Sequence, residues 1–404
     1  MIIKKYLPIL LLIFVNWLGF SIFFPVFPFL IEDYGVSSFW YGLLLSVYSL
    51  GQFFAGPVFG AWSDQHWRKP LLIWSQLGTL LSLLTFVVAV SLVPHIPIAG
   101  IILPLRIVLF SRIIDGITGW NNGVALAYLS DITQWKNKSK AFGMMGAVFG
   151  VSMIVGPAIG WFSVQHRWYT GVGLVAAWIS LITLLFMIFG LEESLTVDKR
   201  DTSPVQLRQA LNVFNRFGII SNFPQVIRLF WVYALFALMF TGYTSTNILY
   251  AKEYLWFDPA QISIMYIIIG AFLIFNQWFA VRKLLDFVDE KKLFVAGIGC
   301  VSIGLLVYIV QPGVWLFYIS AFVATMGIAL CMATFKGIIT QTVDHSAQGK
   351  IIGLDESVMA WSRVIVPALA AWAFTLVGHW VFVVFGGIWL VALWLDWRVT
   401  RKIV

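Results

Sequence analysis

The stretch that decides the fold is PLLIWSQLGTLLSLLTFVVAVSLV, residues 70–93, which contains no charged side chain. A helix needs about 20 apolar residues to cross a bilayer, because its backbone N–H and C=O groups must all be paired within the segment. Eleven further windows are long and predominantly apolar, and none alternates apolar and polar residues as a β-barrel strand does. We therefore expect an all-α integral membrane protein with twelve transmembrane helices, near residues 6–30, 39–62, 70–93, 101–130, 141–163, 169–190, 228–250, 262–281, 293–310, 314–337, 351–375 and 380–396.

The composition excludes a soluble globular enzyme. Of the 404 residues, 60% are hydrophobic and 11% are charged, against roughly 45–50% and about 25% in soluble domains. The net charge is +8, but the charged residues must first be placed relative to the bilayer before this value can indicate nucleic-acid binding. Cys300 and Cys331 both lie in apolar stretches, so neither a disulfide framework nor a cysteine metal site is expected.

The loop charges set the orientation. Short loops rich in Lys and Arg face the cytoplasm, and most of the 26 Lys and Arg residues fall on one side if the N-terminus is cytoplasmic. On the other side the loops keep only Arg167 and Lys252 as basic residues. Both termini are therefore expected in the cytoplasm.

A long hydrophilic stretch divides the spans into six plus six. The expected parts are an N-terminal six-helix bundle (1–190), a cytoplasmic linker (191–227) and a C-terminal six-helix bundle (228–404). In the linker, residues 205–217 suit either a short helix on the inner interface or a plain tether. Shifting the sequence by 210 residues superposes Ser152 on Ser362 and Pro157 on Pro367. This indicates two pseudo-symmetric bundles, an arrangement that usually binds substrate between the halves near the midplane.

Residues 60–72, GAWSDQHWRKPLL, join the second and third spans. A glycine, an aspartate four residues later and a basic pair resemble the loop signature of the major facilitator superfamily, matched here by Gly60, Asp64, Arg68 and Lys69. The resemblance implies that Asp64 interacts with the N-terminal end of a helix in the other half, which attracts anions, and closes the cytoplasmic side. Trp67 replaces the family's glycine. The basic pair is equally explained as a topology signal.

Other segments resemble the twelve-helix drug–proton antiporters of this superfamily. Gly156 and Pro157 belong to a glycine-proline motif in the fifth span, where they permit a bend or simply close packing. RIIDGITG (residues 112–119) and NWLGFSIFFPVFP (residues 16–28) are similar to segments of tetracycline-type exporters. The resemblance implies a proton-coupled exporter in a bacterial inner membrane. Asn16 departs from the pattern, which has a proton-carrying aspartate at that position.

Arg112 and Asp115 are the charged residues deep in the fourth span, three positions apart, and Asn122 follows on the same helical face. An ionisable side chain at bilayer depth costs from about 2.5 kcal/mol upward, so it usually has a partner or faces a cavity. We expect an ion pair. Either it only braces the bundle, or Asp115 carries a proton and its protonation releases Arg112 for another anion.

Span eleven holds a second group of charges. The 210-residue offset places Asp355, Glu356 and Arg363 where span five has uncharged residues. Arg363 lies roughly 12 residues into the helix, near the midplane at 1.5 Å per residue. Asp355 and Glu356 lie close to the cytoplasmic entrance, where they either carry protons or are merely solvated. The expected substrate-binding residues are Arg112, Arg363, Asn16, Asn122 and Trp361.

Two functions stay open. One is a proton-driven efflux antiporter for small organic solutes, working by alternating access, which the antiporter-like motifs favour. The other is a proton-coupled carrier of an anionic solute such as a carboxylate metabolite or carboxylate siderophore. Asn16 and the two arginines expected near the midplane, Arg112 and Arg363, favour it, because guanidinium matches carboxylate geometry. A lipid flippase is a further alternative.

The sequence also predicts which partners and cofactors the protein uses. An enzyme is not expected, since no span carries a catalytic constellation, and a channel is disfavoured by the two-fold repeat. We expect a monomer, a small-molecule solute and the bilayer as partners, no nucleic acid, and no cofactor besides the proton gradient.

Overall fold

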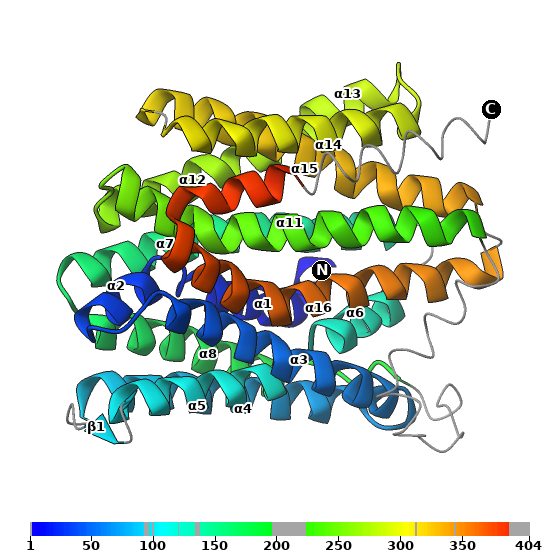
Figure 1. Cartoon of the computed structure of the whole chain (residues 1–404). Helices are drawn as coiled ribbons and strands as arrows, with labels where there is room; N and C mark the ends of the chain where they lie inside the picture. The colour runs from blue at the N-terminus through cyan, green and yellow to red at the C-terminus, as the bar shows by residue number, and fades with distance from the viewer. Residues whose placement is uncertain are drawn as a thin grey trace. The chain divides into compact units, whose positions relative to one another are not determined.

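The long apolar runs form helices, as the sequence predicts (Figure 1). The computed structural model describes residues 2–92, 97–98, 101–119, 121–133, 138–195, 224–311, 313–342 and 345–387. The strands within these ranges, β1 (Pro97–Ile98) and β2 (Ile101–Ile102), make one short antiparallel hairpin. The predicted interfacial helix at 205–217 and the end of the predicted span at 380–396 lie outside the described residues.

The α-helices of the N-terminal part are α1 (Ile2–Ser21), α2 (Val26–Asp33), α3 (Phe39–Gln65), α4 (Arg68–Ser91), α5 (Leu103–Thr118), α6 (Asn121–Ile132), α7 (Lys138–Gln165) and α8 (Tyr169–Gly190). Those of the C-terminal part are α11 (Pro224–Tyr254), α12 (Pro259–Phe275), α13 (Arg282–Leu285), α14 (Glu290–Val307), α15 (Val314–Thr342) and α16 (His345–Val377). A π-helix, η3 (Asn276–Val281), follows α12, and the 3₁₀ turns η4 (Tyr308–Val310) and η5 (Gly378–Trp380) follow α14 and α16.

Eight helical segments of the described residues are long and apolar enough to cross a membrane. They are Tyr6–Asp33, Phe39–Gly60, Arg68–Ser91, Tyr169–Gly190, Phe230–Tyr254, Glu290–Val310, Val314–Phe335 and Val358–Gly387. Two shorter apolar helices, Gly150–Val164 and Pro259–Phe275, overlap the predicted fifth and eighth spans. By length and composition, these helices agree with the predicted all-α membrane architecture.

The fourth span differs from the single helix predicted over 101–130. It consists of α5 and α6, and α5 ends at Gly119, whose N–H donates to the carbonyl of Asp115 at 2.6 Å. A Cβ on Gly119 would lie 2.7 Å from that carbonyl oxygen, so glycine is needed at this position. The carbonyl of Gly119 accepts from Nε2 of Gln52 at 2.9 Å. A side chain of α3 thus bonds a carbonyl at the interruption of the span.

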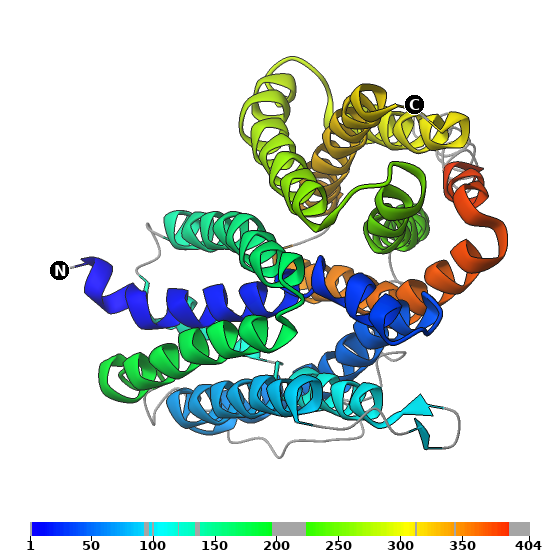
Figure 2. The same ribbon diagram turned by 90° about the vertical axis from the view of Figure 1, so that its left-hand side faces the viewer.

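The chain divides into two compact units. The first comprises residues 1–37, 43–211 and 259–264, and the second comprises residues 38–42, 212–258 and 265–404. In the first unit α1 packs against both α7 and α8, and α4 packs against both α5 and α8 (Figures 1 and 2). Its core joins apolar side chains of α1, α3, α4, α6 and α8, among them Leu12, Leu72 and Leu129.

Glycines let helices of the first unit approach closely. A Cβ on Gly51 of α3 would lie 2.6 Å from the backbone of Gly116 on α5. A Cβ on Gly156 of α7 would clash with the side chain of Ser21, and one on Gly160 would lie 2.6 Å from Pro25. The glycine-proline motif therefore packs against the turn that separates α1 from α2.

In the second unit, α14 packs along α15 and α11 packs along α16. The α14–α15 contact is also built on small residues, since a Cβ on Gly297 would lie 3.0 Å from the carbonyl of Gly327. The π-helix η3 begins at Asn276, whose Nδ2 donates to Oγ1 of Thr325 on α15 at 3.0 Å.

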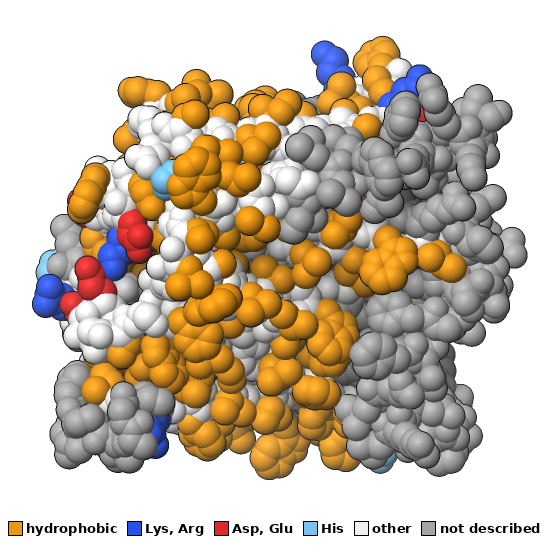
Figure 3. Space-filling model, in the orientation of Figure 1, with side chains coloured by type: hydrophobic (Ala, Val, Ile, Leu, Met, Phe, Trp, Pro, Cys, Tyr) orange, Lys and Arg blue, Asp and Glu red, His pale blue; other side chains and the backbone are white. Residues whose placement is uncertain are grey.

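Large apolar side chains are exposed along many of the described helices, including Trp74, Trp178 and Phe189. Figure 3 shows one face, on which hydrophobic side chains predominate and charged side chains lie mainly toward the margins. Exposed apolar side chains along many helices are what lipid contact requires.

Candidate substrate and proton site

The structure joins Arg112 and Asp115 in an ion pair, as the sequence predicts. Both lie on α5, and Nη1 of Arg112 is 3.1 Å from Oδ2 of Asp115. Their side chains are 3% and 7% exposed. Removing one partner of such a buried pair leaves an uncompensated charge, which costs about 3–5 kcal/mol. The two charges therefore depend on each other.

The guanidinium of Arg112 has neighbours from two other parts of the unit. Nη2 donates to Oγ of Ser82 on α4 at 3.3 Å. The carbon of the guanidinium lies 4.4 Å from the ring centre of Phe23 and 5.9 Å from that of Phe27. A desolvated cation over an aromatic face gains about 2 kcal/mol, so the rings contribute to holding this charge inside the protein.

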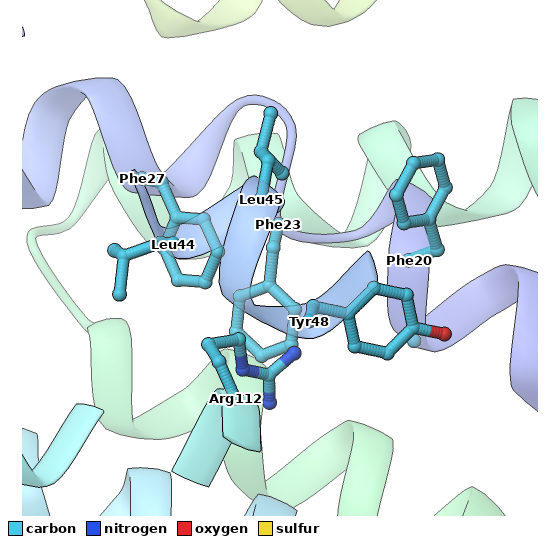
Figure 4. A pocket seen from close by; sticks show the side chains of 8 residues that line it. Phe20, Phe23, Phe27, Leu44, Leu45, Tyr48 and Arg112 are labelled. Atoms are coloured by element: carbon cyan, nitrogen blue, oxygen red, sulfur yellow. The ribbon is translucent and has the colours of Figure 1, made fainter. Parts of the chain in front are cut away.

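A pocket opens beside this arginine. Its lining consists of Gly19, Phe20, Phe23, Phe27, Leu44, Leu45, Tyr48 and Arg112. In Figure 4 the side chain of Arg112 extends from α5 toward the rings of Phe23 and Tyr48, and Phe20 lies on the far side of Tyr48. The pocket thus combines apolar walls with one cationic side chain, in a space with room for about one water molecule.

Asn16 pairs with Asn121 rather than with the ion pair. Nδ2 of Asn16 donates to Oδ1 of Asn121 at 2.5 Å, and Nδ2 of Asn121 donates back to Oδ1 of Asn16 at 3.2 Å. Both amides are buried. The pair joins α1 to the first residue of α6, next to the interruption of the fourth span. Asn121 was not among the predicted site residues; the predicted Asn122 is its neighbour, and the side chain of Asn122 lies outside the described part.

A second polar cluster lies at the N-terminal end of α4, in the loop that resembles the superfamily signature. Arg68 is buried, and its Nε is 2.9 Å from Oδ2 of Asp131, whose side chain is 27% exposed. Nζ of Lys69 donates to the carbonyl of Ile188 at 3.0 Å. Gly60 lies half-buried on α3, and the side chain of Asp64 is not among those described.

Glu193 completes this cluster, although no sequence pattern singles it out. Its carboxylate accepts from the backbone N–H groups of Arg68 and Lys69, each at 3.0 Å. It also accepts from the N–H groups of Ser194 at 3.0 Å and Leu195 at 3.1 Å. A carboxylate at the first N–H groups of a helix is favourable through both hydrogen bonding and the helix dipole. The N-terminal end of α4 thus has its anion in Glu193.

The predicted residues of span eleven lie in the second unit. Arg363 and Trp361 are half-buried on α16, and the side chains of Asp355 and Glu356 lie outside the described part. Between Arg363 and Trp361, Ser362 is hydrogen-bonded to Thr241 of α11, with 2.8 Å between the hydroxyl oxygens.

A multi-pass helical protein with a buried ion pair beside a pocket has the build of a membrane transporter. The chain belongs to the major facilitator superfamily, because the sequence model of that family matches residues 9–283 and 229–403. Members of this superfamily are transporters and not enzymes. This confirms the resemblance to the superfamily and the expectation that the protein is not an enzyme. As such a transporter, the protein sits in a lipid bilayer and acts on small molecules.

Curated relatives within the superfamily include tetracycline resistance proteins. A tetracycline resistance protein of class E from Escherichia coli is 28% identical over 391 residues, covering 95% of this chain and 92% of that protein. One of class H from Pasteurella multocida is 25% identical over 386 residues, covering 93% and 91%. The crystal structure of the human organic anion transporter MFSD10 (TETRAN) has a TM-score of 0.73 and 20% identity, covering 97% of this chain and 99% of that one. This last likeness shows a common fold.

Proposed function

We propose that the protein is a proton-coupled secondary transporter that exports a small organic solute from a bacterium by alternating access. The proposed topology has twelve spans in two bundles, 1–190 and 228–404, joined by a cytoplasmic linker over 191–227, with both termini in the cytoplasm. The kinship with tetracycline resistance proteins supports an efflux antiporter. Ser152 of α7 is hydrogen-bonded to α1, and Ser362 of α16 is hydrogen-bonded to α11. Because the 210-residue repeat relates these two serines, their similar packing supports the pseudo-symmetry.

The observation that carries this proposal is the buried pair of Arg112 and Asp115, 3.1 Å apart. Asp115 can exchange a proton, whereas Asn16 cannot. The proposed roles are proton coupling by Asp115, Asp355 and Glu356; substrate binding by Arg112, Arg363, Asn16, Asn122 and Trp361; and gating by Gly60, Asp64, Arg68, Lys69, Gly156 and Pro157.

A second candidate function is the proton-coupled transport of an anionic solute. The observation that favours it is the chemistry of the pocket, whose charged lining residue is Arg112. An exporter of cationic drugs is expected to present an acid to its cargo, whereas here the acid is already paired with the arginine.

Transport into everted membrane vesicles tests the first candidate. We expect an imposed proton gradient, acidic inside, to drive uptake of tetracycline, and Asp115→Asn to reduce that uptake to the level of vesicles without the protein. The exposed Asp286→Asn is the matched control and is expected to transport normally. Gradient-driven uptake by Asp115→Asn at the wild-type rate would contradict the proposed coupling role.

A further inference from the structure

The end of α5 falls within the predicted fourth span, one helical turn beyond Asp115. The last carbonyl groups of a helix have no partner in their own helix, and an unpaired carbonyl is costly in hydrocarbon, so other groups must bond them. Two side chains of neighbouring helices do so here. Oγ of Ser75 on α4 donates to the carbonyl of Thr118, and Nε2 of Gln52 on α3 donates to that of Gly119 at 2.9 Å. The interruption of the span thus has its own hydrogen-bond donors.

The amide of Gln52 is fixed by both of its partners. A carbonyl oxygen only accepts hydrogen bonds, so the amide must present its nitrogen to Gly119. The other N–H of the same nitrogen donates to the phenol oxygen of Tyr48, one turn earlier on α3, at 2.8 Å. Ser75 is buried and Gln52 is half-buried. Both side chains therefore hold the end of α5 from the inside of the unit.

The end of α5 acts on the charge of Asp115, which lies in the last turn of this helix. The helix dipole places partial negative charge on the carbonyl groups at a C-terminus, and this charge opposes an ionised aspartate. A donor bonded to such a carbonyl offsets part of the charge. The donors also fix the helix end, and with it the separation of 3.1 Å between Asp115 and Arg112, which favours the ionised form. Both effects make protonation of Asp115 easier once the donors are removed.

Other groups around the ion pair are mostly uncharged. The charged group facing Asp115 is Arg112 on the same helix, and the titratable group facing that arginine is Tyr48 on α3. Among the described residues, α4 adds the hydroxyls of Thr79 and Ser82. The helix α2 and the turn before it add aromatic rings. The carbonyl groups at the end of α5 are therefore a substantial part of the electrostatic surroundings of Asp115.

We propose that Gln52 and Ser75 are positioning residues for the proton site. By bonding the last carbonyl groups of α5, they hold Asp115 beside Arg112 and set the pH at which Asp115 takes up a proton. The inference rests on the proposed coupling role of Asp115 and names residues outside the ion pair that control it. Both residues are uncharged and act through α5.

Infrared difference spectroscopy of the purified full-length protein in lipid membranes tests the proposal. A protonated carboxylic acid has its own C=O stretching band, and the band that is lost in Asp115→Asn belongs to Asp115. Recording this band from about pH 4 to pH 9 gives the midpoint of the titration without any substrate. We expect Gln52→Met to move the midpoint to higher pH by about half a unit, and Ser75→Ala to move it in the same direction.

Two variants control for a general loss of stability. The Nε2 of Gln76 on α4 donates to the carbonyl and the hydroxyl of Ser180 on α8, at 3.2 and 2.7 Å, so Gln76→Met also removes two hydrogen bonds of one amide. Ser49 is the control for Ser75, because its hydroxyl donates to a carbonyl of its own helix, α3. We expect Gln76→Met and Ser49→Ala to lower the melting temperature as the test variants do and to leave the midpoint of Asp115 unchanged.

Several results would overturn the proposal. One is a midpoint that stays at the wild-type pH, or moves to lower pH, in both Gln52→Met and Ser75→Ala. Another is an equal shift in Gln76→Met, which would trace the effect to lost stability. An unshifted midpoint in a protein that carries out gradient-driven transport would overturn this inference alone. The expected shifts in a protein that transports nothing would contradict the transport function and support the positioning role. An Asp115 that stays ionised down to about pH 4 would overturn the coupling role and this inference together.

Discussion

At the residue scale, Glu193 binds the N-terminal end of α4. Its single carboxylate accepts four backbone N–H groups, two of them at the first residues of α4. We expect Glu193→Gln to lower the free energy of unfolding by about 2 kcal/mol, because the amide loses the charge at the helix N-terminus and one acceptor oxygen. Thermal unfolding in detergent measures the change.

Glu192 provides the matched control for this prediction. It is the preceding residue, it has the same side chain, and it is exposed. Glu192→Gln is therefore expected to leave the melting temperature unchanged. If both variants melt at the same temperature as the wild type, the carboxylate of Glu193 does not stabilise the end of α4.

The contacts of individual residues were predictable from the sequence only where they are local. Arg112 and Asp115 are three residues apart, and helical spacing alone brings them together. Asn16 and its partner Asn121 are 105 residues apart, and Glu193 and Arg68 are 125 residues apart. Such partners are set by the packing of distant helices, which no local pattern encodes.

At the scale of elements, the crossing of α3 and α5 positions the ion pair. The backbones approach at Gly51 and Gly116, where a Cβ on Gly116 would clash with the carbonyl of Tyr48. We expect Gly116→Ala to lower the free energy of unfolding by about 1–3 kcal/mol, because overpacking forces the two helices apart. The melting temperature and the yield of folded protein in membranes measure the effect.

Gly56→Ala on α3 separates this packing effect from helix propensity. A Cβ on Gly56 meets nothing within 4 Å, and alanine favours the helix by up to about 1 kcal/mol over glycine. The control is therefore expected to be neutral or stabilising. Equal melting temperatures for the two variants would show that the α3–α5 crossing tolerates a side chain.

The interruption of the fourth span could not be predicted from the sequence. The run over 101–130 is apolar enough for one helix, so hydropathy gives no sign of a break. The end of α5 depends on the turn at Gly119 and on Gln52, which is 67 residues away and bonds the carbonyl of Gly119. Discontinuous helices are a known feature of transporter binding sites, and this one lies four residues from Asp115.

At the scale of the whole molecule, the architecture was the most predictable property, because each span is encoded by its own run of apolar residues. Orientation is encoded more weakly, by the positions of Lys and Arg in the loops. The proposed topology places Arg167 outside the cell and Asp286 in the cytoplasm. Both are exposed, and the side chain of Arg167 is 81% exposed, so both positions are accessible to a labelling reagent.

Cysteine labelling in intact cells tests this orientation. In a background with Cys300→Ala and Cys331→Ala, we expect a membrane-impermeant maleimide to label Arg167→Cys in intact cells and Asp286→Cys only after permeabilisation. Replacing Arg167 removes only a surface ion pair with Asp33, with 3.7 Å between the charged atoms, which contributes about 0–1 kcal/mol. The fold is thus preserved. Labelling of Asp286→Cys in intact cells would reverse the assignment of the loops and contradict cytoplasmic termini, since the basic loops would then face outward.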